Sequence, residues 1–256
     1  MDRRSFVQSV AGAGLLSQTA AAQPSAATTH LYCLDYFYYR QGNQASRLQQ
    51  FLSSQASLWT KHSRAFGAFS AVMAPHAQTT LVLTGFTSFE EMSAAESHLE
   101  ADPGFQKARQ ELERGTEPPF DSRQRVLLRA TDFSPDIALA QKPPRPRYFE
   151  IRVYHSPTER QLRLVHERFA GPEIKIFHRS GIHPILYGDT IAGPDMPSLT
   201  YIIPFASLGE REKAWDTFGA DPEWIKVREE SIARGGQIVD YQNLSIWRAA
   251  AFSPIQ

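Results

Sequence analysis

The sequence contains one segment twice, and this repeat limits the possible folds more than any other feature. Residues 86–135 align with residues 205–254 without a gap, and sixteen of the fifty pairs are identical. The clearest match sets "DPGFQKARQE" at 102–111 against "DPEWIKVREE" at 221–230. Similarity at a fixed spacing indicates two copies of one structural unit. A chain of 256 residues is long enough to hold two such units, each with its own core.

Each unit shows the order strand, helix, strand, strand, helix, strand. In the second unit, "RYFEIRVYHS" alternates apolar and polar residues, which is typical of a half-buried strand. "SPTERQLRLVHERF" follows with helical spacing, and Gly171-Pro172 is expected to kink or end that helix. Three further strands are expected at residues 182–188, 198–206 and 241–250. This order is that of the ferredoxin-like fold, an antiparallel sheet with both helices on one face.

The remaining helices are predicted from their first residues. Ser207 with Glu210, like Ser88 with Glu91 in the first unit, matches a capping box. Asp221-Pro222, like Asp102-Pro103, places a capping residue before a proline that suits the first helical turn. The same two start signals therefore occur in both units, at the same spacing.

The expected fold class is α+β, with two tandem ferredoxin-like (βαββαβ) units that pair sheet to sheet as an α/β barrel. The expected boundaries are a first unit at 29–133, a Pro-rich linker at 134–147 and a second unit at 148–252. Four prolines make that linker extended and semi-rigid. The bare sheet face of each unit carries apolar and aromatic residues, and such a surface normally marks an interface. The sequence leaves open whether the barrel closes within one chain or between two chains of a homodimer.

The first 22 residues predict an export signal. Paired Arg3 and Arg4 precede a weakly apolar Gly/Ala-rich run that is too short to span a membrane. Ala20 and Ala22 fit an A-x-A cleavage site. The segment resembles a bacterial twin-arginine signal peptide, and a basic tail is the alternative. We therefore expect an exported protein, periplasmic or secreted, with no membrane span in the mature chain.

Composition and motifs exclude several classes of function. The 27 basic and 27 acidic residues balance, so no net charge favours nucleic acid as a partner. The single cysteine, Cys33, cannot form an intrachain disulfide and is expected to be a small buried residue. The sequence has no dinucleotide fingerprint, P-loop, zinc-protease or serine-hydrolase motif. The spacing of the eight histidines matches no zinc site.

Three segments of the second unit carry a family resemblance. "YFEIRVY", "ASLGEREKAWDTFGADPEWIKV" and "NLSIWRA" resemble the NIPSNAP family of the dimeric α/β-barrel superfamily. The first unit resembles it more loosely, because Cys33, Asp35 and Phe37 stand where the second unit has Glu150, Arg152 and Tyr154. The resemblance implies a ferredoxin-like fold paired through its sheets. It implies little about chemistry, although relatives in the superfamily include haem-binding proteins, small monooxygenases and isomerases.

The candidate site is a set of polar and aromatic residues of the second unit. If the apolar positions of the opening strand face the helices, its other positions face the barrel interior. The candidate pocket residues are Glu150, Arg152, Tyr154, His183, Tyr187 and Tyr201. One interpretation is structural, with Glu150 and Arg152 neutralising each other. The other is functional, with Arg152 fixing an anionic or carbonyl group while Tyr154 or His183 moves a proton.

We therefore expect a protein of unassigned activity that binds a small apolar or aromatic molecule or serves as a scaffold. The alternative is a barrel enzyme of monooxygenase or isomerase type, or a haem-binding protein. No catalytic residue, metal site or cofactor is evident from the sequence, and haem remains open only through the resemblance.

Overall fold

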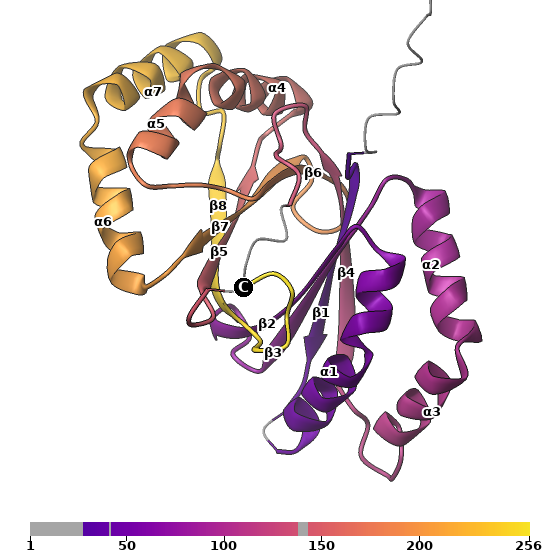
Figure 1. The fold of residues 1–256 in the computed structure, drawn as a ribbon. Helices are drawn as coiled ribbons and strands as arrows, with labels where there is room; N and C mark the ends of the chain where they lie inside the picture. Colours follow the sequence, from indigo (N-terminus) through magenta and orange to yellow (C-terminus); the bar gives the residue numbers. More distant parts are fainter. Residues whose placement is uncertain (1–27, 41, 138–142) are drawn as a thin grey trace, which may run out of the picture.

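The computed structural model describes residues 28–40, 42–137 and 143–256 (Figure 1). The predicted signal peptide at 1–22 and part of the predicted linker lie outside these residues. The first half of the chain forms β1 (Leu31–Tyr38), α1 (Gln44–His62), β2 (Ala65–Met73), β3 (Thr79–Phe86), α2 (Phe89–Ala101), α3 (Pro103–Leu112) and β4 (Ser122–Ala130). The second half forms β5 (Tyr148–His155), α4 (Glu159–Arg168), the π-helical segment η1 (Phe169–Glu173), α5 (Ile174–Arg179), β6 (Leu186–Ala192), β7 (Ser198–Phe205), α6 (Leu208–Gly219), α7 (Pro222–Gly235) and β8 (Tyr241–Ala249).

The eight strands form one closed barrel in the order β1-β3-β2-β8-β5-β7-β6-β4, and every neighbouring pair is antiparallel. Within each half the strand order is that of the ferredoxin-like fold. The halves join where β2 pairs with β8 and where β4 pairs with β6. The predicted fold is confirmed, and the barrel closes within a single chain.

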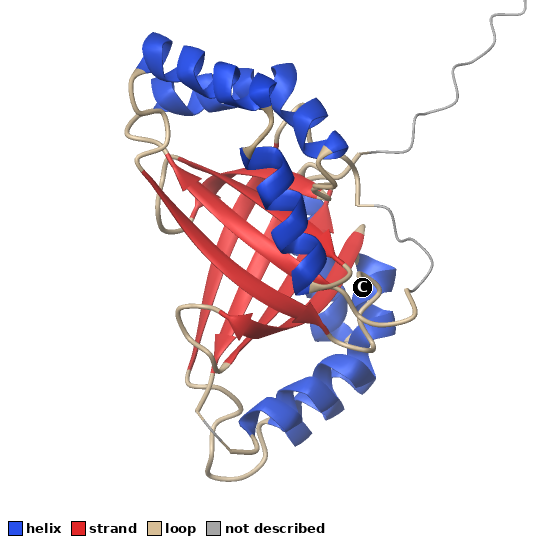
Figure 2. Cartoon of the chain, turned by 90° about the vertical axis from the view of Figure 1, so that its left-hand side faces the viewer, coloured by secondary structure: helices blue, strands red, loops and turns tan. Residues whose placement is uncertain are grey.

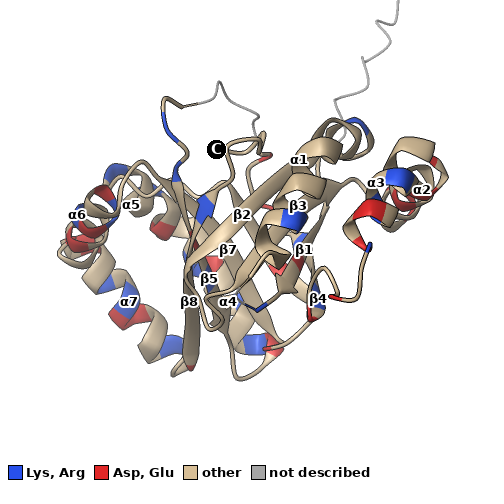
Figure 3. Cartoon of the chain, turned by 90° about the horizontal axis from the view of Figure 1, so that it is seen from below, with Lys and Arg blue, Asp and Glu red and all other residues tan. Residues whose placement is uncertain are grey.

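The helices of the two halves cover opposite sides of the barrel (Figure 1), and the turned view in Figure 2 shows the helices packed around the outside of the strands. Seen from below, charged residues of both signs are spread over the helices on both sides (Figure 3). This mixture agrees with the equal numbers of basic and acidic residues in the sequence. Within the described ranges, the helices are all too short or too polar to cross a bilayer.

The predicted helix starts are confirmed. The hydroxyl of Ser207 accepts a hydrogen bond from the backbone N–H of Glu210 at 3.1 Å, and the Ser88 hydroxyl caps α2 in the same way. The carboxylates of Asp102 and Asp221 cap α3 and α7. These bonds satisfy backbone donors that a helix leaves without an internal partner.

One predicted strand of the second half differs in its bounds from the structure, and the predicted helix kink is confirmed. The strand expected at 182–188 is β6, which begins only at Leu186. The helix expected to kink or end near Gly171-Pro172 does kink there, and it passes through η1 and continues as α5. Gly171 has non-helical torsions of φ −83° and ψ −116°, and Pro172 cannot donate a backbone hydrogen bond. The helix therefore changes its direction at this point without ending.

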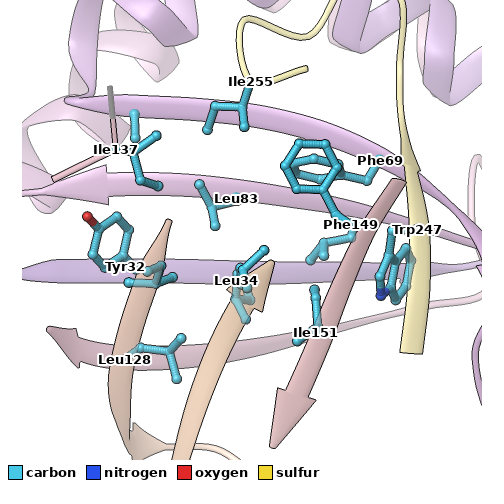
Figure 4. Packing of buried hydrophobic residues seen from close by; sticks show 14 of the residues in the cluster. Tyr32, Leu34, Phe69, Leu83, Leu128, Ile137, Phe149, Ile151, Trp247 and Ile255 are labelled. Atoms are coloured by element: carbon cyan, nitrogen blue, oxygen red, sulfur yellow. The ribbon is translucent and has the colours of Figure 1, made fainter. Parts of the chain in front are cut away.

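The predicted facing of the sheet residues is wrong. Phe149 and Ile151 belong to a core cluster inside the barrel, together with residues of the first half (Figure 4). Tyr187 and Tyr201 belong to a different cluster, between the second sheet and its helices. The predicted alternation is present, but both alternating faces of these strands are buried. When both faces of a strand are buried, the alternation of its side chains does not show which face lies inside the barrel.

Candidate binding site

The barrel interior is filled at one end and hollow at the other. At the filled end, Tyr32 and Ile137 pack against leucines of the strands, and Ile255 from the C-terminal segment adds to this core (Figure 4). At the other end the strands enclose a cavity of about 220 Å³, whose edge includes the exposed residues Pro75 and His76. We call this cavity the barrel-mouth pocket. Both halves of the chain line it, which makes it a property of the complete barrel.

The inner wall of the barrel-mouth pocket is aromatic and apolar. The rings of Tyr36 and Trp247 lie 5.8 Å apart, and Leu34 and Ile151 complete the wall. The Tyr36 hydroxyl has no hydrogen-bond partner in the described part of the chain. Burial raises the pKa of Tyr36, so its phenol is neutral near pH 7. A neutral phenol in this position can donate one hydrogen bond and accept others.

The side of the pocket carries uncharged polar groups whose capacity is only partly used. The Tyr38 hydroxyl donates to Gln124 Oε1 at 2.8 Å, which leaves the Gln124 amide N–H groups available. Trp247 Nε1 donates to Ser245 Oγ at 2.8 Å, which leaves the Ser245 hydroxyl hydrogen available. Hydrogen bonds thus fix these side chains in place, and each retains a donor for a ligand.

One carboxylate lies at the mouth of the pocket. Asp195, in the loop between β6 and β7, has φ 59°, a left-handed conformation that Asp adopts more readily than most residues. Its oxygens accept hydrogen bonds from the Tyr241 hydroxyl at 2.9 Å and from Asn243 Nδ2 at 2.8 Å. Asp195 forms no ion pair within the described residues. Its negative charge therefore disfavours an anionic ligand in the pocket.

The pocket is suited to a neutral ring that carries a hydrogen-bonding group. Pockets of this kind combine apolar walls with a few placed polar groups. In the part of the chain that the structure describes, no cluster of three or more His, Cys, Asp or Glu residues is arranged to hold a metal. A cavity of about 150 Å³ holds benzene, so about 220 Å³ admits a ring with substituents. It is too small for a haem, whose macrocycle contains four linked rings.

Five of the six predicted site residues do come together, but outside the barrel. Glu150, Arg152, Tyr154, Tyr187 and Tyr201 lie between the second sheet and its helices. The predicted position inside the barrel is therefore wrong, because these residues occupy the other face of β5, β6 and β7. His183 is separate from them: it is exposed and stacks on His178 at 5.1 Å between ring centres.

Glu150 is the centre of a buried ionic network. It is fully buried and accepts hydrogen bonds from Arg152, from Arg211 and, at 2.9 Å, from Trp215 Nε1. The Arg152 guanidinium lies 3.6 Å from the centre of the Trp215 ring. The pairing of Glu150 with Arg152 matches the structural interpretation of these residues. The two partners from α6 were not predicted, because nothing in the sequence links residue 150 to residues 211 and 215.

The tyrosines form a second group beneath η1. Tyr187 and Tyr201 are paired across β6 and β7, and their rings lie 5.7 Å apart. Both hydroxyls are buried and lack a hydrogen-bond partner in the described residues. Glu173, also buried, receives a 2.7 Å hydrogen bond from Arg168 Nε. Burial raises the pKa of Glu173 despite the opposing effect of Arg168.

The sequence offered only partial signals for the barrel-mouth pocket. Aromatic residues were expected on the bare sheet faces, and one aromatic residue of β8, Trp247, does lie inside the barrel. The tyrosines of "LDYFYY" alternate along β1, so Tyr36 and Tyr38 share its inner face. Asp195 could not be assigned to the pocket, because a turn-rich loop has no regular alternation that would predict where its side chains point.

Comparisons with known proteins agree with this architecture. The model of the NIPSNAP family matches residues 149–254. The second unit is a NIPSNAP domain. A NIPSNAP family protein of unknown function from Agrobacterium tumefaciens is 20% identical and covers 46% of this chain and 100% of its own, with a TM-score of 0.39. A sequence search of curated proteins gives no match.

Solved structures resemble the complete barrel that contains the NIPSNAP domain. A candidate monooxygenase from Lactobacillus acidophilus is 9% identical and covers 86% of this chain and 94% of its own, with a TM-score of 0.54. An anthrone oxidase-like protein is 14% identical and covers 87% of this chain and 92% of its own, with a TM-score of 0.52. At such low identity these similarities establish the shared fold and nothing about the reaction.

Proposed function

We propose that this NIPSNAP-domain protein binds a small, neutral, aromatic molecule in the barrel-mouth pocket. The observation that carries the proposal is the hollow end of an otherwise filled barrel, with an aromatic wall and unused hydrogen-bond donors. The Tyr36 hydroxyl is the main anchor, because no residue of the described chain satisfies it. Asp195 at the mouth selects against anions. A phenol or an indole has the required size, neutrality and hydrogen-bonding group.

The first experiment is native mass spectrometry, with an absorbance spectrum, on the mature protein exported by its own signal peptide. A ligand that is bound during folding is then retained. An additional mass of a few hundred daltons or less would agree with the pocket size. A Soret band would show a bound haem and would contradict the proposed ligand class.

A direct titration tests the pocket itself. Indole and 2-naphthol are titrated into the mature protein by calorimetry. We expect Val153→Phe, which places a ring in the pocket, to abolish binding, and Ile225→Phe on the exposed side of α7 to leave binding unchanged. Tyr36→Phe should weaken 2-naphthol binding about fivefold, since a net hydrogen bond contributes about 1 kcal/mol. Equal binding by Val153→Phe and the unmodified protein would refute the proposal.

The alternative function is a barrel enzyme, since solved structures with this fold include a candidate monooxygenase and an anthrone oxidase-like protein. Both likenesses are at fold level. The barrel-mouth pocket offers a neutral phenol and a carboxylate, Tyr36 and Asp195, as its titratable groups besides Tyr38 and His76. Oxygen consumption with a bound hydroxylated aromatic would support this alternative, and its absence under saturating ligand would favour binding alone.

We further propose that the protein is exported through the twin-arginine route. The support is the sequence from Arg3 to Ala22, which lies outside the described residues. Replacement of Arg3 and Arg4 by lysines should retain the precursor in the cytoplasm. Cell fractionation with an antibody to the mature chain would measure this, and unchanged export of the lysine variant would contradict it.

A further inference from the structure

A second cavity lies on the outer side of the NIPSNAP domain, apart from the barrel-mouth pocket. It has a volume of about 290 Å³ and lies between α7 and the ends of β5 and β8. We call it the α7 groove. Val153 lines the pocket inside the barrel, and the next residue, Tyr154, lines the groove outside. The two cavities are thus separated by the wall of the barrel.

The inner side of the groove holds an arginine with unused donors. The Arg168 side chain is only 9% exposed, and its Nε donates to Glu173 at 2.7 Å. Its guanidinium lies 5.2 Å from the centre of the Trp224 ring, which fixes its position. No partner for its two terminal nitrogens is found in the described residues. A guanidinium presents five N–H donors, so four remain for a ligand.

A second arginine borders the groove from α7. Arg228 is exposed and forms no ion pair within the described chain. The one carboxylate that lines the groove, Asp240, is bonded to His155 Nδ1 at 2.6 Å. Glu173 pairs with Arg168, whereas Arg228 has no carboxylate within ion-pair distance in the described residues. The two arginines therefore supply the unused hydrogen-bond donors of the groove, whereas the mouth of the barrel carries the carboxylate of Asp195.

The first half of the chain provides an internal comparison. Arg109 is the repeat counterpart of Arg228, and its guanidinium is held by Glu100 and by Gln106. Phe37 stands at the position of Tyr154, so this half lacks the phenol hydroxyl as well. Only the second half leaves the arginine on this helix available to a ligand.

We infer that the α7 groove binds an organic carboxylate, with its carboxylate between Arg168 and Arg228. Arginine recognises carboxylates well because its planar donors match the two oxygens. The apolar part of the ligand would lie against Ile232 and Tyr241, which are 41% and 44% exposed. These side chains make the groove more suitable for a carboxylate with an aromatic or short aliphatic body than for an inorganic anion.

The test is calorimetric titration of the full mature protein with benzoate at moderate salt, with benzyl alcohol as the neutral isostere. We expect binding of benzoate and none of benzyl alcohol at the groove. Arg228→Gln should weaken benzoate binding about fivefold, which corresponds to about 1 kcal/mol for one partly solvated charge. Arg109→Gln is the matched control and should leave the affinity unchanged.

A second variant tests Arg168 without leaving Glu173 unpaired. The double substitution of Arg168→Gln with Glu173→Gln replaces the ion pair by two amides that can bond to each other. We expect this variant to fold and to lose benzoate binding by at least tenfold. Equal affinity in this variant, or equal affinity of Arg228→Gln and Arg109→Gln, would overturn the inference. Binding of inorganic phosphate as tight as that of benzoate would overturn the ligand class.

The same titration separates this inference from the proposed function of the barrel. Val153→Phe fills the barrel-mouth pocket and should leave benzoate binding unchanged, because the groove lies on the other side of the wall. Loss of benzoate binding in Val153→Phe would place the ligand inside the barrel and contradict the groove site. Indole binding by Arg228→Gln should remain normal, so either site can fail while the other stands.

Discussion

The two halves share a fold but differ in the layer between sheet and helices. At corresponding register positions, the first half has Asp35, Val82 and Ala68 across β1, β3 and β2. The second half has Arg152, Tyr201 and Tyr187 across β5, β7 and β6. Two small apolar residues in one half are thus replaced by two buried phenols in the other. The repeat conserves the strand pairing, while the content of this layer has diverged.

The covering helices differ in agreement with this layer. α1 runs without interruption for 19 residues over Ala68 and Val82. Its counterpart in the second half is broken into α4, η1 and α5. Larger side chains on the sheet require the helix above them to shift, and π-helical segments permit such a shift. The same break places Glu173 and Arg168 beside the tyrosines and at the edge of the α7 groove.

The charged groups of this layer also differ between the halves. Asp35 is paired with Arg123 and Arg125, whose side chains are 40% and 31% exposed. Glu150 is paired with Arg152, which is only 12% exposed, and with Arg211. A carboxylate held by exposed arginines can be lost at a moderate cost, since those arginines can turn to water. The loss of a carboxylate held by a buried arginine costs more, since that arginine cannot turn to water.

The largest effect is expected for Glu150→Ala. It leaves Arg152 buried without its partner, and breaking a buried pair in this way costs about 3–5 kcal/mol of the free energy of unfolding. The same substitution at Asp35 should cost clearly less. Urea unfolding of both variants measures the difference. If Asp35→Ala is as damaging as Glu150→Ala, exposure of the arginines does not control the cost.

The next effect is a contrast in pH dependence between Asp35 and Glu173. Burial raises the pKa of Asp35, but the bonds from Arg123 and Arg125 outweigh it, so the pKa of Asp35 is lowered overall. Its contribution to stability is therefore present above its unfolded pKa and is lost as the pH falls through its folded pKa. For Glu173 burial prevails and the pKa is raised. Its contribution is present below its unfolded pKa and is lost as the pH rises through the folded pKa.

The two substitutions to amides should therefore respond to pH in opposite directions. Asp35→Asn should destabilise the protein at neutral pH. The loss should shrink as the pH falls below about 4, where the Asp35 carboxyl becomes protonated first in the unfolded state and then, at its lowered pKa, in the folded state. Glu173→Gln should be tolerated better at neutral pH than in acid, relative to the unmodified protein. Unfolding free energies at several pH values between 3 and 7 measure both. A parallel pH response of the two variants would contradict the opposite pKa shifts.

Much of the fold followed from the sequence because it depends on local signals. The repeat fixed the number of units, and the capping residues Ser88, Ser207, Asp102 and Asp221 fixed four helix starts. Alternation along β5 identified a strand. The caps and the alternation are decided by residues close together in the sequence, and the repeat appears when the sequence is aligned with itself, so each feature can be recognised without the tertiary structure.

The candidate site could not be predicted in the same way, because it depends on which face of each strand lies inside the barrel. Phe149 and Ile151 face the interior, while Glu150 and Arg152 face the helices, where Arg211 and Trp215 neutralise the charge. Glu150 and Arg152 were expected to face the barrel interior, but the helix layer can hold them because α6 supplies partners for their charges. Such partners come from distant segments and leave no signal in the local pattern.

The smallest expected effect concerns the buried phenols that distinguish the two halves. Tyr201→Phe and Tyr187→Phe remove hydroxyls that have no partner in the described residues. An unsatisfied buried polar group costs about 1–3 kcal/mol, so each substitution should leave the free energy of unfolding unchanged or raise it by about 1 kcal/mol. Thermal unfolding of the two variants measures this, with Tyr38→Phe as a control that removes a bonded hydroxyl.

If Tyr201→Phe or Tyr187→Phe destabilises the protein as much as Tyr38→Phe does, an ordered water or ligand must satisfy that hydroxyl. The divergence of this layer would then reflect a bound molecule, whereas stabilisation would show that the second half retains its phenols at a cost to its own stability.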